Sequence, residues 1–433
     1  MEAPRALYTA LAFALLPWLP LRLWWRARRE PGYGVAIGER FGRYGQYANA
    51  AVAAPLLWIH AVSVGETRAA VPLIARLKAA YPQATILLTH MTATGRETGR
   101  ALFGDGVVQA WLPYDFPFAV RAFLAHFRPA AGCLIETELW PNLIAEARAR
   151  DIPLFLVNAR LSERSARAYA RFAPLTVPMV GRLAGVAAQS PDDAARLAAL
   201  GAPSPVVTGN LKFDVSLPDT ARALGAEFRT RFGATRQVWV AASTREGEET
   251  LLLDALSRAP LAHDALLVLV PRHPQRFAGV AAQLRERGVP FVRRSDNAPV
   301  PADVGVVLGD SMGEMLAYYA AADLAFIGGS LLPLGGQNLI EALAAGTPVL
   351  TGPHTFNFSD ATVGAIAAGA ALRVADADAL IAAIAELFSN ASTRESMRKA
   401  AAAFHAAHRG AAERLQHWLA PQLARRGLDT AAS

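Results

Sequence analysis

Acidic and basic residues directly follow several apolar runs of this chain, at positions where parallel strands would end. Glu66 closes the segment HAVSVGE, and Glu136 follows a buried run at the start of ETELWPN. Lys212 lies in GNLKFD, in a chain where arginine provides nearly every other cation. A carboxylate can accept a proton from a reacting hydroxyl, and an ammonium group can stabilise charge on a departing phosphate. These residue types therefore predict acid–base chemistry coupled to the loss of a phosphate.

The sequence also leaves a structural interpretation open for each of these residues. Glu66 could be a first-turn carboxylate that complements a helix dipole. Glu136 could belong to a strand end that precedes a helix with Pro141 in its first turn, and Lys212 could be an ordinary surface lysine. The pair Glu136 and Glu138 nevertheless suggests tuned acid–base chemistry, because neighbouring carboxylates shift each other's pKa.

The second half of the chain carries candidate phosphate-binding residues. Arg272 and His273 follow a predicted strand in PRHPQRF, and arginine there can pair with phosphate through two hydrogen bonds. Capping boxes are predicted at Ser243–Glu246, Ser311–Glu314 and Asn338–Glu341. The two glycines of GGQNLIE would let a ligand approach the backbone closely. Neither GxGxxG nor a Walker A sequence occurs here, which argues against a dinucleotide dehydrogenase or a P-loop ATPase.

Short apolar runs alternate with amphipathic helical stretches, a pattern typical of βαβ units and parallel sheets. The alternation is interrupted between Asp214 and Gln237, which marks a domain boundary. Two doubly wound α/β halves describe the GT-B architecture, with ligands expected at the carboxyl ends of strands in a cleft between the halves. The expected strands are 56–62, 84–90, 132–136, 153–159, 185–189 and 205–209 before the boundary, and 238–243, 266–271, 289–294, 304–309, 324–329 and 348–352 after it.

The N-terminal segment Ala6–Trp25 predicts a membrane anchor, because about 20 apolar residues can span a bilayer. Pro17, Pro20 and Arg22 favour a tilted or half-inserted helix over a clean span. Arginines follow the segment, so the positive-inside rule places the body of the protein in the cytoplasm. A buried N-terminal helix of a soluble protein is the alternative, but tryptophans beside arginines are typical of a membrane interface. These residues are Trp18, Trp24, Trp25, Arg26, Arg28 and Arg29.

Composition narrows the class of protein further. The chain has 433 residues, of which 53% are hydrophobic and 18% charged, so it can bury the cores of two domains. A single cysteine, Cys133, excludes a disulfide framework and suits a reducing cytoplasm. The formal charge of +7 indicates an anionic partner. Nucleic acid is not favoured, because the arginines are scattered and form no basic helix with interleaved aromatic residues.

Taken together, the motifs resemble the Kdo (3-deoxy-D-manno-oct-2-ulosonic acid) transferase family of lipopolysaccharide synthesis. The resemblance extends from Tyr33 to Ala361 and includes the preceding anchor. Gln275 stands where the family's PRHPERF has glutamate, outside the positions that matter for chemistry. The matching motifs, in the family's order, are HAVSVGE, ETELWPN, NARLSERS, GNLKFD, PRHPQRF, MGEM and GGQNLIE.

The resemblance implies an inverting GT-B glycosyltransferase that moves Kdo from CMP-Kdo to a lipid A precursor, lipid IVA, at the cell inner membrane. It implies an anchor at 1–32, an acceptor-binding Rossmann-like domain at 33–214 and a CMP-Kdo-binding Rossmann-like domain at 215–433. Glu66 matches the family's proton acceptor, whereas Glu136 and Lys212 match positions that stabilise the transition state. The resemblance assigns CMP binding to Arg272, His273, Met312, Gly313, Glu314, Asn338, Leu339, Ile340 and Glu341.

The expected mechanism uses no cofactor and no metal ion, because the second half shows no DxD-type pair. Two alternatives stay open, namely another GT-B envelope transferase with a UDP-sugar donor and a catalytically inactive membrane-bound scaffold. CMP but not UDP should protect a Kdo transferase, and an inactive scaffold has no reason to keep Glu66, Glu136 and Lys212 together. The number of Kdo units, the acyl pattern of the acceptor, the oligomeric state and full spanning by the N-terminal helix are not determined by the sequence.

Overall fold

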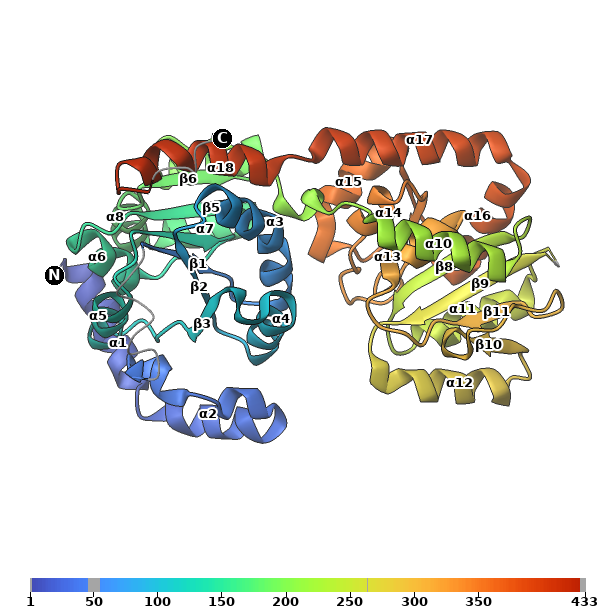
Figure 1. The fold of residues 1–433 in the computed structure, drawn as a ribbon, viewed down its shortest axis with the longest axis horizontal. Coiled ribbons are helices and arrows are strands. Elements are labelled where there is room, and N and C mark those ends of the chain that lie inside the picture. Colours follow the sequence, from blue (N-terminus) through green and yellow to red (C-terminus); the bar gives the residue numbers. More distant parts are fainter. Residues whose placement is uncertain (1, 46–54, 263, 429–433) are drawn as a thin grey trace. The chain divides into compact units, whose positions relative to one another are not determined.

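The computed structural model describes residues 2–45, 55–262 and 264–428 and divides the chain into two compact units (Figure 1). Unit 1 comprises Met1–Asp214 and Arg409–Ser433, and unit 2 comprises Val215–His408. The sequence-based division differs from this one in the C-terminal segment, because it assigned everything after residue 214 to the second domain.

Unit 1 contains a parallel sheet of seven strands in the order β3-β2-β1-β4-β5-β6-β7. Trp58 of β1 packs with Phe123 on one face, whereas its neighbour Ile59 packs with Leu73 on the other. Helices cover both faces, which explains why the strands read as continuous apolar runs. The strands are β1 (Leu56–His60), β2 (Thr85–His90), β3 (Val108–Trp111), β4 (Ala131–Ile135), β5 (Leu154–Ala159), β6 (Gly185–Ala188) and β7 (Val206–Val207).

Two groups of helices enclose this sheet. Those on the face of Phe123 are α5 (Pro117–Phe127), α6 (Pro141–Ala149), α8 (Ala173–Val180) and α9 (Pro191–Ala199). Those on the face of Leu73 are α3 (Val64–Ala80) and α18 (Ala411–Ala424). The remaining helices that follow strands of this unit are α4 (Ala93–Phe103) and α7 (Glu163–Arg171).

The C-terminal helix α18 belongs to unit 1 because it completes one face of that unit's core. Leu415, Leu419 and Leu423 are buried among the side chains of α3 and the sheet. The Asp214 carboxylate accepts hydrogen bonds from the free N–H groups at the helix start, including Gly410 N at 2.6 Å. Such a side chain satisfies donors that a helix N-terminus leaves unpaired.

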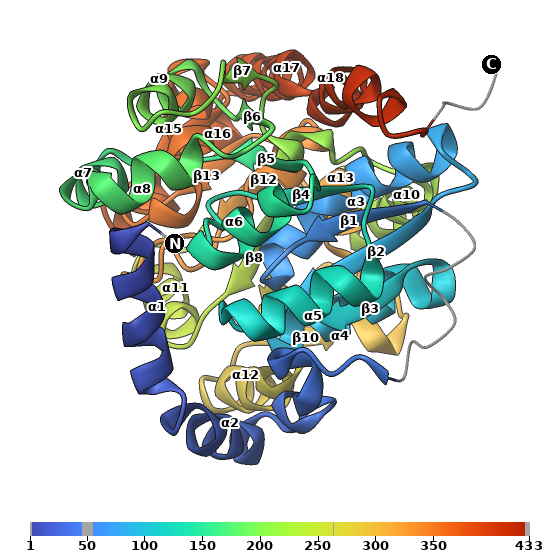
Figure 2. The same ribbon diagram turned by 90° about the vertical axis from the view of Figure 1, so that its left-hand side faces the viewer.

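The N-terminal segment forms two helices, α1 (Ala3–Leu15) and α2 (Trp18–Arg29), where the sequence predicted one. The break falls at Pro17, since proline lacks the N–H that would continue the helix, and the two axes differ by 56° (Figure 2). Among the described residues, neither helix alone has the length and apolar character of a membrane span, whereas the bent pair passes this test together.

Unit 2 contains a second parallel sheet, in the order β10-β11-β9-β8-β12-β13-β14. Trp239, Leu267 and Phe326 of three neighbouring strands pack together in its core. The strands are β8 (Gln237–Thr244), β9 (Ala265–Pro271), β10 (Phe291–Arg293), β11 (Val306–Leu308), β12 (Leu324–Ile327), β13 (Val349–Thr351) and β14 (Ala371–Arg373).

The helices of unit 2 follow its strands in the same alternating manner (Figure 1). Leu252, Val280 and Leu380 pack from three of them onto one face of the sheet. The helices are α10 (Asp219–Phe232), α11 (Glu248–Arg258), α12 (Phe277–Glu286), α13 (Met315–Ala321), α14 (Ile340–Ala344), α15 (Ser359–Ala367), α16 (Ala377–Ser389) and α17 (Ala391–His408).

All strands expected from the apolar runs are confirmed, with ends that differ by up to two residues. Two further strands, β3 and β14, were not predicted. Both are short edge strands, and their sequences VQAW and ALR mix polar with apolar residues. An edge strand needs little apolar surface, so the sequence signal that marks a central strand is weak there.

Candidate active site

The strand order of unit 1 reverses between β1 and β4, so ligand binding is expected at the carboxyl ends of these two strands. Glu66 lies in the first turn of α3, just after β1, and Glu136 directly follows β4. The prediction that both carboxylates lie at strand ends is therefore confirmed. The roles of these residues in a reaction stay predictions at this point.

Glu66 is a first-turn carboxylate of α3, as the structural interpretation predicted. Its surroundings also shift the pKa of its carboxyl group. Its carboxylate accepts hydrogen bonds from Val62 N at 2.7 Å and from Ser63 Oγ at 2.8 Å. Burial is the largest cause that raises the pKa of Glu66 to about 7, and the charges of Glu136 and Glu138 act in the same direction, whereas these two hydrogen bonds lower it. A carboxylate with a pKa near neutral pH is suited to general-base catalysis.

Glu136 and Lys212 form an ion pair, although they lie far apart in the sequence. Lys212 Nζ is 2.9 Å from Glu136 Oε1, and both side chains are about a quarter exposed. Lys212 is therefore not an ordinary surface lysine. Glu136 has a φ of 64°, in the left-handed region that non-glycine residues rarely adopt. Such strain is often found at functional sites, where it fixes the direction of a side chain.

Two buried or half-buried asparagines position Lys212, and sequence reasoning gave them no role. Asn158 is fully buried at the end of β5, and its Oδ1 accepts a hydrogen bond from Leu211 N at 2.9 Å. Asn210 Oδ1 accepts a hydrogen bond from Lys212 N, also at 2.9 Å. The motifs NARLSERS and GNLKFD contain these two residues. An asparagine at a strand end was therefore the sequence signal that could have identified them as positioning residues.

Glu138 and the buried His60 lie beside the same strand ends. Glu138 Oε2 accepts a hydrogen bond from Trp140 Nε1 at 2.9 Å and lies 4.0 Å from His60 Nε2. Burial raises the pKa of Glu138, and the charge of Glu136 adds to this effect. Burial lowers the pKa of His60 to about 3, so its imidazole is neutral at physiological pH. These strand ends thus bring Glu66, Glu136, Glu138 and Lys212 together beside a neutral His60.

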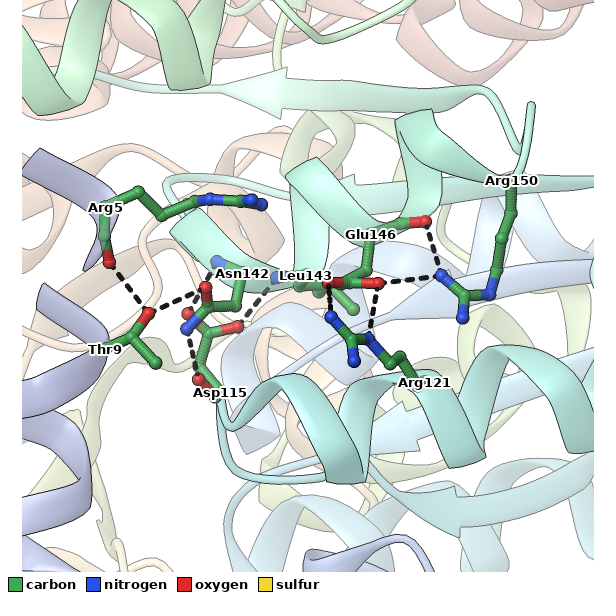
Figure 3. Close-up of polar contacts among 8 residues, drawn as sticks. All are labelled: Arg5, Thr9, Asp115, Arg121, Asn142, Leu143, Glu146 and Arg150. Carbon is green, nitrogen blue, oxygen red and sulfur yellow. Dashed lines mark hydrogen bonds and ion pairs between the residues drawn. The ribbon is translucent and has the colours of Figure 1, made fainter. Parts of the chain in front are cut away.

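Asn142, the last residue of ETELWPN, connects this region to the N-terminal helix (Figure 3). It is fully buried, and its Oδ1 accepts a hydrogen bond from Thr9 Oγ1 of α1 at 3.0 Å. The Asp115 carboxylate accepts hydrogen bonds from Asn142 N and Leu143 N at 2.9 and 2.8 Å, which satisfies the start of α6. Asn142 is therefore a structural residue that holds α1 against α6.

The candidate residues of unit 2 lie at the ends of adjacent strands. Arg272 and His273 follow β9, and Met312–Glu314 follow β11, its neighbour in the sheet. Arg272 Nε donates a hydrogen bond to Gln337 Oε1 at 3.2 Å, which connects the end of β9 to GGQNLIE. His273 is exposed overall, but partial desolvation of its ring and the charges of neighbouring arginines lower its pKa.

The other predicted nucleotide-binding residues differ in exposure. Met312 is 59% exposed, whereas the side chains of Leu339 and Ile340 lie in the core and cannot reach a ligand. Asn338 Nδ2 donates to Glu341 Oε1 at 3.0 Å, and Asn338 Oδ1 accepts from Ile340 N at 3.0 Å. Both side chains are thus fixed by local hydrogen bonds before any ligand binds.

Two of the predicted capping boxes are wrong. Ser243 belongs to β8, and α11 begins at Glu248. Ser311 Oγ hydrogen-bonds to the Tyr318 hydroxyl at 2.7 Å, while Glu314 forms an ion pair with Arg294 at 2.8 Å. In the second case, contacts with Tyr318 and Arg294 replace the local cap. The third pair, Asn338 and Glu341, does interact, but through side chains.

The glycines of GGQNLIE serve packing and backbone conformation. Gly335 and Gly336 have φ values of 89° and 74°, which favour glycine. A Cβ atom at Gly335 would lie 2.5 Å from atoms of Phe356 and Asn357, so neighbouring side chains already fill that space. Contact of a ligand with the backbone at these glycines stays a prediction.

No group of three or more His, Cys, Asp or Glu residues that could hold a metal ion occurs in the part of the chain that the structure describes. Cys133 is buried, and burial raises the pKa of its thiol to about 12, so it is not a candidate nucleophile. A cavity of about 470 Å³ lies beside α2 and is lined by Arg29, Arg96, Arg100 and Trp111, among others.

Comparison with known proteins gives a consistent result. The family model of 3-deoxy-D-manno-octulosonic-acid transferase (kdotransferase) matches residues 36–215, and that of glycosyl transferases group 1 matches residues 251–404. A 3-deoxy-D-manno-octulosonic acid transferase of Bordetella pertussis is 48% identical over 433 residues, covering 96% of this chain and 99% of the relative. The transferase of the same name from Haemophilus influenzae is 39% identical over 427 residues, covering 97% and 99%.

Solved structures share the fold at low sequence identity. UDP-GlcNAc 2-epimerase from Neisseria meningitidis has a TM-score of 0.58 at 16% identity and covers 84% of this chain and 99% of its own. A glycosyltransferase from Rickettsia africae has a TM-score of 0.55 at 14% identity and covers 87% and 99%. At this identity the likeness concerns the fold alone, and it identifies the two parallel α/β units as GT-B-like.

Proposed function

Because the chain belongs to the 3-deoxy-D-manno-octulosonic acid transferase family, we propose that it transfers Kdo from CMP-Kdo to a lipid A precursor, lipid IVA, in lipopolysaccharide core synthesis. The observation that carries this proposal is the arrangement at the strand ends of unit 1. There Glu66, with a pKa near 7, lies beside an ion pair between Glu136 and Lys212. This combination suits deprotonation of a hydroxyl and stabilisation of a departing phosphate.

The chemistry is a single displacement at the anomeric carbon of the donor sugar. Glu66 accepts the proton of the acceptor hydroxyl while the acceptor oxygen forms a bond to the anomeric carbon. The bond between that carbon and the phosphate oxygen of CMP breaks, and the configuration inverts. Lys212 stabilises the charge that develops on the phosphate, and Glu136 orients the ammonium group of Lys212 through their 2.9 Å contact.

Unit 2 is proposed to bind the nucleotide. Arg272 and His273 at β9 and Met312–Glu314 after β11 present polar or exposed atoms at one edge of the sheet. Asn338 and Glu341 complete this set. Leu339 and Ile340 contribute by packing, because their side chains are buried. Acceptor binding is assigned to the 33–214 part of unit 1, and donor binding to unit 2.

The two N-terminal helices are proposed to lie in the surface of the inner membrane, with both units on its cytoplasmic side. One side of the helices docks onto unit 1, where Thr9 and Leu23 are buried and the tilted rings of Phe13 and Phe116 have centroids 5.2 Å apart. Large apolar side chains of the same helices are exposed, at 51–66% of their surface. These are Leu7, Leu11, Leu15, Trp18, Leu21, Trp24 and Trp25.

A helix with one docked side and one exposed apolar side fits the membrane interface better than a full span. Arg28 and Arg29 lie over the rings of Trp24 and Trp25, with distances of 3.7 and 4.1 Å to the ring centroids. Such pairs suit the headgroup layer, where anionic lipids attract arginine. The apolar face and the arginines of the cavity beside α2 would hold an acylated and phosphorylated acceptor near the membrane surface.

The test is transfer by the purified full-length protein from CMP-Kdo to lipid IVA in detergent micelles, followed by mass spectrometry of the lipid. The expected product gains the mass of one or more Kdo residues, and CMP but not UDP inhibits its formation. Transfer from a UDP-sugar would support the alternative donor class. A protein that binds CMP without forming product would support an inactive scaffold and contradict the proposal.

A further inference from the structure

An arginine outside the proposed nucleotide-binding set lies where the strand order of unit 2 reverses, between β8 and β12. Arg245 directly follows β8, and Gly328 and Gly329 directly follow β12. A Cβ atom built on Gly329 would lie 3.5 Å from Arg245 Cγ and 3.1 Å from Gln337 Nε2. Gln337 is also the hydrogen-bond partner of Arg272. Open α/β sheets bind ligands at such reversals, so Arg245 lies at the expected centre of the ligand site.

The backbone around Arg245 is fixed by one buried carboxylate. Glu248 is fully buried, and it accepts hydrogen bonds from Arg245 N at 2.9 Å, Gly329 N at 2.6 Å and Leu331 N at 3.1 Å. Ser243, two residues before Arg245, has a φ of 56°, and the pairing of β8 with β9 shifts at this point. A bulge of this kind redirects the chain and its side chains. The ends of β8 and β12 are thus tied together before a ligand binds.

The charges around this point leave Arg245 available to an anion. Arg276 is neutralised by Glu249 through two hydrogen bonds of 2.6 and 3.0 Å. His273 has a lowered pKa, because of burial first and then the charges of Arg272, Arg245 and Arg276. The Glu248 carboxylate contacts the backbone N of Arg245, and no carboxylate of the described residues forms an ion pair with its guanidinium.

We propose that Arg245 binds the carboxylate of the donor sugar and thereby selects an acidic sugar. This assignment rests on the proposed function. The nucleotide part of CMP-Kdo carries one negative charge, on its phosphodiester, and Arg272 is the cation already assigned to it. The sugar adds a second negative charge at its carboxylate. Arginine binds carboxylates through two parallel hydrogen bonds. A second cation is therefore needed for the sugar carboxylate. Arg245 can supply it, because Arg245 follows β8 and Arg272 follows the neighbouring strand β9.

The experiment compares Arg245→Gln with wild-type protein on two probes. The first is CMP-Kdo, with its KM measured in the transfer assay. The second is the methyl ester of CMP, which has the phosphodiester charge but no carboxylate, with its Kd measured by calorimetry. We expect the KM for CMP-Kdo to rise about 10- to 100-fold, the effect of losing a charge-assisted pair. The Kd of the methyl ester should change less than about threefold.

Two further variants sharpen the result. Arg245→Lys keeps the charge but loses the two-pronged geometry, so it should recover part of the affinity for CMP-Kdo. Arg285→Gln removes an exposed arginine at the end of α12 and should leave both constants unchanged. Thermal unfolding of each variant should match that of wild type, because the backbone contact with Glu248 is retained.

The outcomes separate this assignment from the proposed function. An equal loss of affinity for both probes would place Arg245 on the phosphate and overturn the assignment to the carboxylate. Unchanged constants for both probes would remove Arg245 from the donor site. In either case a wild-type protein that transfers Kdo leaves the proposed function intact, whereas a wild-type protein that transfers no Kdo contradicts that function itself.

Discussion

In unit 1 the strand order reverses between β1 and β4, and in unit 2 it reverses between β8 and β12. Glu66 and Glu136 follow the two strands in unit 1, whereas Arg245 and Gly329 follow them in unit 2. Burial acts on both sites by disfavouring charge. It raises the pKa of Glu66 to about 7 in unit 1 and lowers the pKa of His273 in unit 2.

The two sites therefore have the same location in the sheet and opposite chemistry. The acidic site of unit 1 suits a base, and the basic site of unit 2 suits an anionic ligand. Both sites also contain a residue with a left-handed backbone conformation near the point where the strand order reverses. These residues are Glu136, with a φ of 64°, and Ser243, with a φ of 56°. Topology thus determines where a ligand can bind, while the side chains at the strand ends determine what happens there.

The strongest test of this proposed division of roles is Glu66→Gln, which removes the proposed base of unit 1 and leaves unit 2 untouched. Turnover should fall by about 10²- to 10⁴-fold, the usual effect of losing a general base. The Kd of CMP should stay at its wild-type value. Glu163→Gln, an exposed first-turn glutamate of α7, is the matched control and should have no effect. A Glu66→Gln protein with more than about a tenth of wild-type turnover would rule out the role of Glu66 as the base.

Lys212 should affect turnover more than donor affinity, because an ammonium group interacts most strongly with the phosphate charge that develops during the reaction. We expect Lys212→Ala to lower kcat by about 10²-fold with little change in KM. Lys212→Arg should recover only part of the rate. Lys78→Ala, at an exposed lysine of α3, serves as the control. A normal kcat with a raised KM would instead assign Lys212 to donor binding.

The pH dependence of transfer should report the raised pKa of Glu66. A base acts in its deprotonated form, so kcat/KM should fall about tenfold per pH unit below a midpoint near 7. The charge of Glu136 contributes to this raised value. Glu136→Gln should therefore move the midpoint to lower pH, in addition to any loss of rate. An unchanged midpoint would show that Glu136 and Glu66 are not coupled.

The smallest expected effect concerns stability and is confined to unit 1. Asp115→Ala removes the acceptor for Asn142 N and Leu143 N at the start of α6. Leaving buried donors unpaired should lower the free energy of unfolding by about 1–3 kcal/mol, measured by urea denaturation. The Kd of CMP should not change. Asp105→Ala, in an exposed turn, is the control, and equal stability of both variants would contradict the role of Asp115.

Local patterns in the sequence were sufficient to locate the strands and the first two carboxylates. An apolar run that is buried on both faces is visible without knowledge of its neighbours, and Glu66 and Glu136 each follow such a run directly. Predictions from local sequence patterns were wrong where a residue from elsewhere in the chain bonded to the same side chain. The cap expected between Ser311 and Glu314 gave way to contacts with Tyr318 and Arg294.

The N-terminal segment and the C-terminal helix show the same limit. Pro17 gave a local signal for the break between α1 and α2, but the sequence could not show that Thr9 docks onto Asn142. The assignment of α18 to unit 1 depends on Asp214 and on the core side chains of α3. These partners lie roughly 200 residues or more before α18 in the chain, so no local pattern identifies them.

By itself, the sequence determined the two α/β halves, the apolar N-terminal segment and the residue types available for chemistry, because these depend on composition and on spacing along the chain. Only the tertiary structure decided which of those residues meet. Three features follow from strand order: the pairing of Lys212 with Glu136, the burial of Glu66 beside two other carboxylates, which raises its pKa, and the place of Arg245 beside Gly329. The order of parallel strands is set by how helices pack across the sheet, and this packing is a property of the whole domain.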